Sequence, residues 1–420
     1  MNVLLIAPYI SIHVDKKLER DNFYPSAALL HLAGAIRAHN HSPVILDFNN
    51  RVVYEATLKE DSIEYCKRVI FKTIEKEKPD LIGLNVLFSG NFPDVLKFAQ
   101  VIKEKYPKIK IAIGGIHPTS YYKEILTNCS EIDFVAIGEG ETSLLKLIKC
   151  LENKDFEGLK NIKGFAHRDE SGKIHCNLER EFIEDLDSIP LPAWDLIDFK
   201  NFEMKLDTYY NPKNLPLKNK AAMFSSRACP LACNFCDMFL VMGKKHRKRG
   251  VAKIVDELEV LVKEHGVTYF SFMDDQLTLN KGHTLELCDE IIKRKLNIQF
   301  DAPNGVWINS LRDDLVGKLA EAGLTMCSLA IEHGNDFIRN KIIGKNLKRD
   351  KIFEAAGYLK KYNVLSGGFF IMGFPEDTNE TLQDTYDMIL ELQLDKTNVQ
   401  TALPFPGTAL FKQVVKDKLL

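Results

Sequence analysis

The chain has 420 residues, of which 45% are hydrophobic and 27% are charged, and its formal net charge at pH 7 is -2. This length is enough for about two or three domains with full-sized cores, and the composition excludes a fibrous or intrinsically disordered protein. Because basic and acidic residues nearly balance, the chain has no strong net electrostatic field that would favour nucleic acid or an anionic membrane surface as the partner.

The N-terminal third alternates short apolar runs with helical periodicity. The predicted strands are 3–7, 44–48, 81–87, 109–113 and 134–137, and the predicted helices are 26–39, 63–76, 93–105 and 142–151. Continuous apolar strands separated by helices predict a parallel sheet covered on both faces, so we expect an α/β domain of the flavodoxin or Rossmann type at residues 1–151. Ligands of such folds bind beyond the carboxyl ends of the strands.

The loops predicted after the third, fourth and fifth strands are rich in small and polar residues. They run from Asn85 to Asn91, from Gly114 to Thr119 and from Gly138 to Glu141. Glycine in such loops lets the backbone approach a flat, bulky ligand closely, although glycine after a strand is also ordinary turn punctuation.

Residues 152–220 break the alternation. Phe165 to Cys176 predicts a hairpin that turns at Asp169 to Gly172, and the proline-containing stretches Ile189 to Trp194 and Asn211 to Pro216 are typical of an extended linker. We therefore expect residues 152–220 to form a hairpin and linker region between two domains.

Strand-like and helical runs alternate again from residue 221 onward. The predicted strands are 222–225, 269–273, 299–301, 326–331 and 367–371, and the predicted helices are 251–265, 284–294, 313–322 and 350–362. This repeated strand and helix unit predicts a partial (β/α) barrel at residues 221–420, with its site at the carboxyl ends of the strands.

Cys229, Cys233 and Cys236 follow the first strand of that barrel with C-x-x-x-C-x-x-C spacing. Three thiolates on one short loop can hold three irons of a cubane cluster and leave the fourth iron open to a small molecule, as a reaction centre requires. A structural zinc knuckle is the alternative, but zinc sites usually carry four ligands and no nearby His or Cys completes the set.

The other six cysteines are scattered without paired spacing, which favours free thiols and a cytoplasmic protein. No apolar run approaches membrane-spanning length, so no membrane span is expected. The apolar start of the chain runs into Pro8, which fits a buried first strand better than a signal peptide.

The cysteine loop, with Phe235 just before its third cysteine, resembles the signature of the radical S-adenosylmethionine (SAM) superfamily. Later runs look like the same domain: Phe272 to Gln276, Leu329 to Gly334, Gly368 to Pro375 and Pro404 to Thr408. The first domain is similar to the cobalamin-binding module of the cobalamin-dependent class, through Tyr24 to Ser26, Leu32 to Gly34 and the glycine loops at 114–119 and 138–141.

The resemblance implies three cofactors: a 4Fe-4S cluster on the three cysteines, SAM chelated to the open iron, and cobalamin. It also implies an external low-potential electron donor. Asp274 and Asp275 match positions near the methionyl end of SAM, Glu332 matches an acidic position associated with its ribose, and Phe235 belongs to the same cofactor site. A helix cap or a turn is the alternative for the two aspartates.

For cobalamin, the resemblance implies contacts from the glycine loops. The candidate residues are Ser89, Gly114, Gly115, His117, Thr119, Gly138, Glu139 and Glu141. The D-x-H-x-x-G motif that coordinates cobalt through histidine is not matched, because Leu29 stands where the aspartate before His31 should be. His117 is therefore expected to contact corrin side chains, with a turn-stabilising histidine as the alternative.

The resemblance predicts a methyltransferase that acts on an unactivated carbon or a similar weak nucleophile, through a 5′-deoxyadenosyl radical and methylcobalamin. The expected substrate is a small molecule of natural-product or lipid type. A cyclase or rearrangement enzyme with the same cofactors and no net methylation is the nearest alternative, and a non-catalytic iron–sulfur or cobalamin sensor is a more distant one.

The basic run from Lys244 to Arg249 lacks interleaved aromatic residues that stack bases, so no nucleic-acid partner is expected. Relatives often continue beyond the position of Thr408 with a region that closes over the substrate. The sequence leaves open whether the chain is truncated or a short member of the family.

Overall fold

The computed structural model describes residues 1–8, 25–57, 59–202 and 219–419, which form two compact units. The first unit contains the described residues up to 202 together with Leu240–Met242, and the second contains the remainder. Tyr24 and the linker predicted from Asn211 to Pro216 lie outside the described residues. Among the helices that are described, none is long and apolar enough to cross a membrane.

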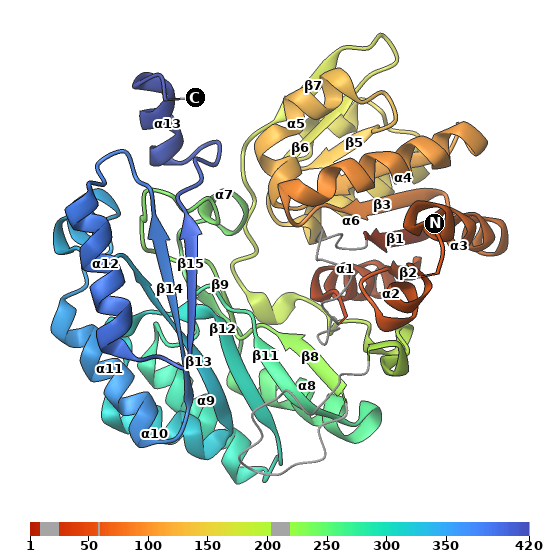
Figure 1. Cartoon of the computed structure of the whole chain (residues 1–420). Coiled ribbons are helices and arrows are strands. Elements are labelled where there is room, and N and C mark those ends of the chain that lie inside the picture. Colours follow the sequence, from red (N-terminus) through yellow and green to blue (C-terminus); the bar gives the residue numbers. More distant parts are fainter. Residues whose placement is uncertain (9–24, 58, 203–218, 420) are drawn as a thin grey trace. The chain divides into compact units, whose positions relative to one another are not determined.

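The first unit is a seven-stranded sheet in the order β2-β1-β3-β4-β5-β6-β7 (Figure 1). Its strands are β1 (Asn2–Ala7), β2 (Ser42–Asp47), β3 (Leu81–Asn85), β4 (Lys110–Gly114), β5 (Phe134–Ala136), β6 (Phe165–Arg168) and β7 (Ile174–Asn177). Its helices are α1 (Ala27–Ala38), α2 (Arg51–Thr57), α3 (Ser62–Glu77), α4 (Phe92–Lys105), α5 (Ile116–Asn128) and α6 (Gly140–Glu152), with short 3-10 turns at Ser89–Asn91, Gly158–Asn161, Leu186–Ser188, Trp194–Leu196 and Phe199–Phe202.

Strands β1 to β5 pair in parallel in the doubly wound order β2-β1-β3-β4-β5 of flavodoxin-like folds. The alternating side chains of β1 show why its apolar run is continuous: Leu4 and Ile6 pack with α3, α4 and α5 on one face, and Val3 and Leu5 pack with α1 and α6 on the other. The expected parallel α/β sheet is confirmed, and the carboxyl ends of its strands form one edge.

The hairpin predicted from Phe165 to Cys176 is present as β6 and β7, which pair antiparallel. Strand β6 also pairs antiparallel with β5, so the hairpin extends the first sheet. The loop predicted from Gly114 to Thr119 is shorter than expected, because α5 already begins at Ile116.

The second unit contains a six-stranded parallel sheet in the order β15-β14-β13-β12-β11-β8. Its strands are β8 (Asn219–Met223), β9 (Ser226–Arg227), β10 (Arg247–Lys248), β11 (Val267–Phe272), β12 (Gln299–Val306), β13 (Leu324–Glu332), β14 (Leu365–Met372) and β15 (Lys396–Thr401). Its helices are α7 (Phe239–Met242, which the two units share), α8 (Val251–His265), α9 (Lys281–Lys293), α10 (Asp313–Ala322), α11 (Arg349–Lys361), α12 (Asn379–Leu392) and α13 (Ala409–Lys416), with a 3-10 turn at Ile308–Ser310 and a π turn at Ile338–Ile342.

Each main strand of this sheet lies beside the previous main strand of the chain, so the repeated unit winds in one direction. Helices α8 to α12 lie along the outer face of the curved sheet (Figure 1). This arrangement is the expected partial (β/α) barrel. Strands β9 and β10 form a separate antiparallel pair next to the cysteine loop.

Candidate active site

The three cysteines of the C-x-x-x-C-x-x-C loop lie between β9 and α7, and all three are half-buried free thiols. Burial raises the pKa of Cys229 to about 11 and that of Cys236 to about 12, and it also raises the pKa of Cys233. A thiolate at any of these positions therefore needs a nearby positive charge, which iron supplies on binding.

The described residues contain no group of three or more His, Cys, Asp or Glu side chains arranged to hold a single metal ion. A structural zinc site usually carries four protein ligands, whereas a cubane cluster with one open iron needs three thiolates, each on a different iron. The three thiols of the cysteine loop are the donor set of such a cluster.

Segments far along the chain hold the cysteine loop in place. The backbone N–H of Asn234 donates to the carbonyl of Ile343 at 3.1 Å, and the N–H of Leu410 at the start of α13 donates to the carbonyl of Asn234 at 3.0 Å. Cys233 and Phe235 pack against an apolar cluster of Ile338, Ile343, Phe374, Leu410 and Val414. Phe235 thus helps to fix the loop, and its contact with SAM stays a prediction.

Asp274 follows β11 and ties the end of that strand to the end of β8. Its buried carboxylate accepts hydrogen bonds from the N–H of Ser225 at 3.0 Å and from the hydroxyls of Ser225 and Ser226 at 2.5 and 2.6 Å. Burial raises the pKa of Asp274, and these hydrogen bonds oppose that rise. The geometry supports an anchoring role for Asp274, and the predicted SAM contact stays untested.

Asp275 lies at the entry of the cysteine loop. Its Oδ2 accepts the backbone N–H of Ala228, the residue before Cys229, at 3.0 Å. Burial and the charge of Asp274 raise the pKa of Asp275 to about 6, against the opposing charges of Arg247 and Arg227. This carboxylate is therefore coupled directly to the backbone that carries the cysteines.

Glu332 ends β13 with a backbone φ of +71°, a left-handed conformation that is uncommon for a residue with a side chain. Its buried carboxylate accepts a hydrogen bond from the Lys345 ammonium at 2.6 Å. Strained backbone of this kind often occurs at functional sites. Lys345 was not predicted as a site residue, because it stands 13 residues after Glu332 in a loop without periodic spacing.

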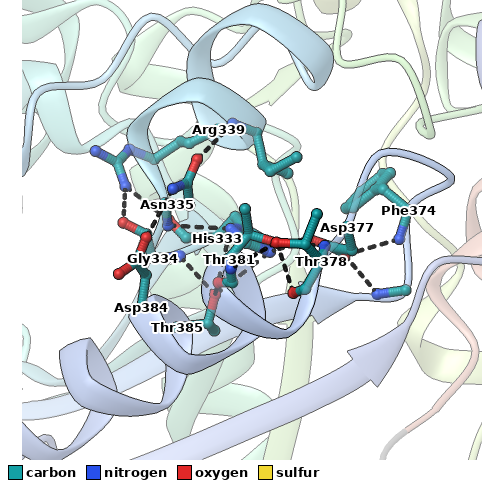
Figure 2. Close-up of polar contacts among 12 residues, drawn as sticks. His333, Gly334, Asn335, Arg339, Phe374, Asp377, Thr378, Thr381, Asp384 and Thr385 are labelled. Carbon is teal, nitrogen blue, oxygen red and sulfur yellow. Dashed lines mark hydrogen bonds and ion pairs between the residues drawn. The ribbon is translucent and has the colours of Figure 1, made fainter.

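His333, the residue after Glu332, lies at the centre of a buried polar network (Figure 2). The His333 ring lies 3.0 Å from the carboxylate of Asp377 and also contacts the hydroxyl of Thr385. Asp377 accepts the hydroxyl of Thr381 at 2.8 Å. The network joins the segments that follow β13 and β14. Its residues stand just after two predicted barrel strands, and this position in the sequence could have identified them as site candidates.

In the first unit, the structure brings together candidate cobalamin residues that follow β3 and β4. The His117 ring lies 3.0 Å from the hydroxyl of Ser89 and stacks between Phe92 and Tyr121, at centroid distances of 4.6 and 4.7 Å. His117 belongs to the first turn of α5, and burial lowers its pKa.

The glycine loops meet at the same edge of the sheet. Gly115 has a φ of +122°, and a Cβ there would lie 2.3 Å from the carbonyl of Val86. The N–H of Gly138 donates to the Thr119 hydroxyl at 3.0 Å, which joins the loop after β5 to the first turn of α5. Gly114 pairs with the end of β3 through its carbonyl, which accepts the N–H of Val86 at 2.8 Å.

The two glutamates of the third glycine loop lie apart from this arrangement. Glu139 accepts the backbone N–H of Ile183 at 2.9 Å, and buried Glu141 lines a cavity with His39 and His41 beside α6. A cobalamin contact therefore stays a prediction for every member of the candidate set.

Two family models match the chain, one in each predicted domain. A model of the B12 binding domain matches residues 18–148, and a model of the radical SAM superfamily matches residues 223–389. The chain belongs to the cobalamin-dependent radical SAM enzymes. Its cofactors are therefore a 4Fe-4S cluster, SAM and cobalamin, and a radical SAM enzyme needs an external reductant.

Relatives of this radical SAM enzyme extend over both units. An uncharacterized methyltransferase of Pyrococcus horikoshii is 28% identical over 420 residues, which are 100% of this chain and 84% of the relative. The anaerobic magnesium-protoporphyrin IX monomethyl ester cyclase of Rubrivivax gelatinosus is 30% identical over 393 residues, which are 93% of this chain and 66% of that enzyme.

The fold is also that of a solved radical SAM enzyme. The radical SAM methyltransferase TsrM from Kitasatospora setae, solved with cobalamin and a 4Fe-4S cluster, superposes with a TM-score of 0.77 at 16% identity. The match covers 99% of this chain and 75% of TsrM. At this identity the likeness establishes the fold, and the roles of individual residues rest on the geometry described above.

Proposed function

We propose that this radical SAM enzyme is a methyltransferase that acts on an unactivated carbon or a similar weak nucleophile. The observation that carries the proposal is that one chain joins a loop of three half-buried thiols at barrel strand ends to a B12 binding domain. When bound, the cluster and SAM supply a radical and cobalamin supplies a methyl carrier. Relatives named as methyltransferases support the same conclusion.

The protein's own residues bind and orient these groups. Cys229, Cys233 and Cys236 would hold three irons, and Asp275 and Glu332 would accept hydrogen bonds from the ammonium and hydroxyl groups of SAM. In the first unit, the packed ring of His117 and the close backbone approach at Gly115 would form part of the cobalamin surface.

The substrate in this proposal is a small molecule of natural-product or lipid type, and the compartment is the cytoplasm. The nine free cysteines support a reducing compartment. Cyclisation or rearrangement is a second candidate function, because a relative named as a cyclase is 30% identical over 93% of the chain.

The test is anaerobic incubation of reconstituted enzyme with SAM, cobalamin and titanium(III) citrate, followed by analysis for two products. Methyl transfer predicts S-adenosylhomocysteine that forms only when cobalamin is added, together with 5′-deoxyadenosine. A rearrangement enzyme would give 5′-deoxyadenosine without S-adenosylhomocysteine. Replacement of all three loop cysteines by alanine provides the control, and it should remove iron, labile sulfide and 5′-deoxyadenosine together.

A further inference from the structure

Lys345 lies in the segment between β13 and α11, whose course is fixed by the buried guanidinium of Arg339. Arg339 donates to the carbonyls of His333 and Gly334 at 2.7 and 2.9 Å, and to the carbonyl of Leu347 at 2.9 Å. It also pairs with Asp336 (Figure 2 includes part of this network). Both ends of the segment are thus tied to one side chain, which itself has no exposed surface.

This segment holds the Lys345 side chain in the interior. The Lys345 N–H donates to the carbonyl of Arg339 at 3.0 Å, and its ammonium lies 2.6 Å from the carboxylate of Glu332. The side chains of Lys345 and Glu332 are only 4% and 8% exposed, so little solvent screens either charge.

The same segment runs beside the cysteine loop. The carbonyl of Ile343 accepts the N–H of Asn234, and a Cβ on Gly344 would lie 3.7 Å from the carbonyl of Ala232. Residues 343 and 344 therefore lie beside residues 232 to 234, and Cys233 packs against the apolar cluster that includes Ile343.

The buried ammonium of Lys345 interacts with other polar groups of this region. Burial lowers the pKa of Lys345, but the charge and hydrogen bond of the Glu332 carboxylate oppose burial, and the pKa of Lys345 is raised overall. The side chains of Cys229 and Cys233 lie near enough to Lys345 to interact with its charge.

We propose that Lys345 is a fixed cation that raises the reduction potential of the cluster held by the three cysteines, and that Glu332 partly offsets it. Reduction adds one electron from the external donor to the cluster, which becomes more negative. A buried ammonium stabilises that added charge, and a buried carboxylate destabilises it. The proposal rests on the iron–sulfur cluster of this family and does not depend on methyl transfer.

The test is a redox titration of the holoenzyme without SAM or substrate, followed by electron paramagnetic resonance of the reduced cluster. Lys345→Met should shift the midpoint to a more negative potential, with at least a tenfold fall in the ratio of reduced to oxidised cluster at fixed potential, which is about 59 mV for one electron. Glu332→Gln, which keeps the size of the side chain and removes its charge, should shift the midpoint in the opposite direction.

The matched control is Lys351→Met, which removes a lysine charge on α11 that pairs with Glu354 at the surface. It should leave the midpoint unchanged because solvent screens that charge. Iron and labile sulfide are measured for each variant.

Unchanged midpoints in Lys345→Met and Glu332→Gln proteins that contain the full cluster would overturn the proposal, as would shifts of both variants in the same direction. If the Lys345→Met protein does not retain iron, the direction of the midpoint shift in the Glu332→Gln protein tests the proposal. Because no substrate is present, a failed methyl-transfer assay leaves this result unaffected.

Discussion

His333 and Asp377 join the ends of two neighbouring barrel strands through one buried contact, 3.0 Å from Nε2 to Oδ1. The Nδ1 atom of His333 accepts the N–H of Asn335 at 3.0 Å, so the neutral ring carries its proton on Nε2 and donates it to Asp377. The other oxygen of Asp377 accepts the N–H groups of Gly373 and Phe374 at 2.8 and 2.9 Å. Figure 2 shows how this pair links the segment after Glu332 to the segment after β14.

Asp377→Ala should therefore destabilise the second unit. The substitution leaves the ring N–H of His333 and the N–H groups of Gly373 and Phe374 without their acceptor, and we expect a loss of about 2–4 kcal/mol. Chemical denaturation of the apoprotein measures this change in the free energy of unfolding. Asp387→Ala removes an exposed carboxylate on α12, the helix that follows Asp377, and should cost less than about 0.5 kcal/mol; equal losses would refute the role of Asp377.

The stability of the second unit should also depend on His333 at mildly acidic pH. Burial lowers the pKa of His333 from its ordinary value of 6.5. The negative charges of Asp377 and Asp384 act to raise this pKa, and the positive charge of Arg339 lowers it further, so the pKa is lowered overall. The unfolded state thus takes up a proton more readily than the folded state, so stability is lost as the pH falls below about 6.5.

His333→Gln removes this titration, and the variant should lose less stability than the wild type between about pH 7 and pH 5. Denaturation midpoints of both proteins across this range measure the difference. The other histidines whose pKa is lowered by burial, such as His117 and His246, titrate in both proteins and cancel. Parallel pH profiles would show that His333 does not contribute.

Hydrophobic periodicity predicted many of the strands and helices that bury a face, such as α10 at Asp313–Ala322, which was predicted with the same bounds. It did not predict α12 and α13, although both bury apolar residues. It missed β15, because the sequence Lys396–Thr401 is an exposed edge strand with almost no apolar pattern. It also took the start of α5 for a loop, because Gly115 and Pro118 are ordinary turn residues. Local patterns therefore found the core better than the edges.

The site residues also differ in how well the sequence predicts them. The cysteine loop and the acidic residues at the strand ends stand in short runs that can be recognised in the sequence. The residues that orient them cannot be recognised in this way, because Lys345 contacts Glu332 and Ile343 contacts Asn234 through the fold of a segment that no spacing rule specifies. Such contacts depend on tertiary packing, and the sequence of one chain contains no local signal for them.

Asp274→Asn should reduce the amount of iron that the protein retains. Its Oδ1 accepts the hydroxyls of Ser225 and Ser226, and its Oδ2 accepts the N–H of Ser225, just before the cysteine loop. Asn keeps one acceptor oxygen, but its amide nitrogen cannot accept the hydrogen bond at the position of the second oxygen. Iron and labile sulfide after anaerobic reconstitution measure the effect, with Asp289→Asn, at an exposed carboxylate on α9, as the control. If Asp274→Asn retained the full cluster and bound SAM more weakly, Asp274 would be a SAM contact and not an anchor.

Gly115→Ala should weaken cobalamin binding and destabilise the first unit, because both the backbone and the space at this position exclude a side chain. The φ of +122° is unfavourable for alanine, and the added Cβ would lie 2.3 Å from the Val86 carbonyl, so we expect a loss of about 1–3 kcal/mol. Gly90→Ala is the matched control in the neighbouring strand-end loop, since a Cβ at Gly90 would meet nothing within 4 Å. Cobalamin absorbance after gel filtration and the denaturation midpoint measure both effects, and a Gly115→Ala protein that retained cobalamin as well as the Gly90→Ala protein would exclude this edge of the sheet as the cobalamin surface.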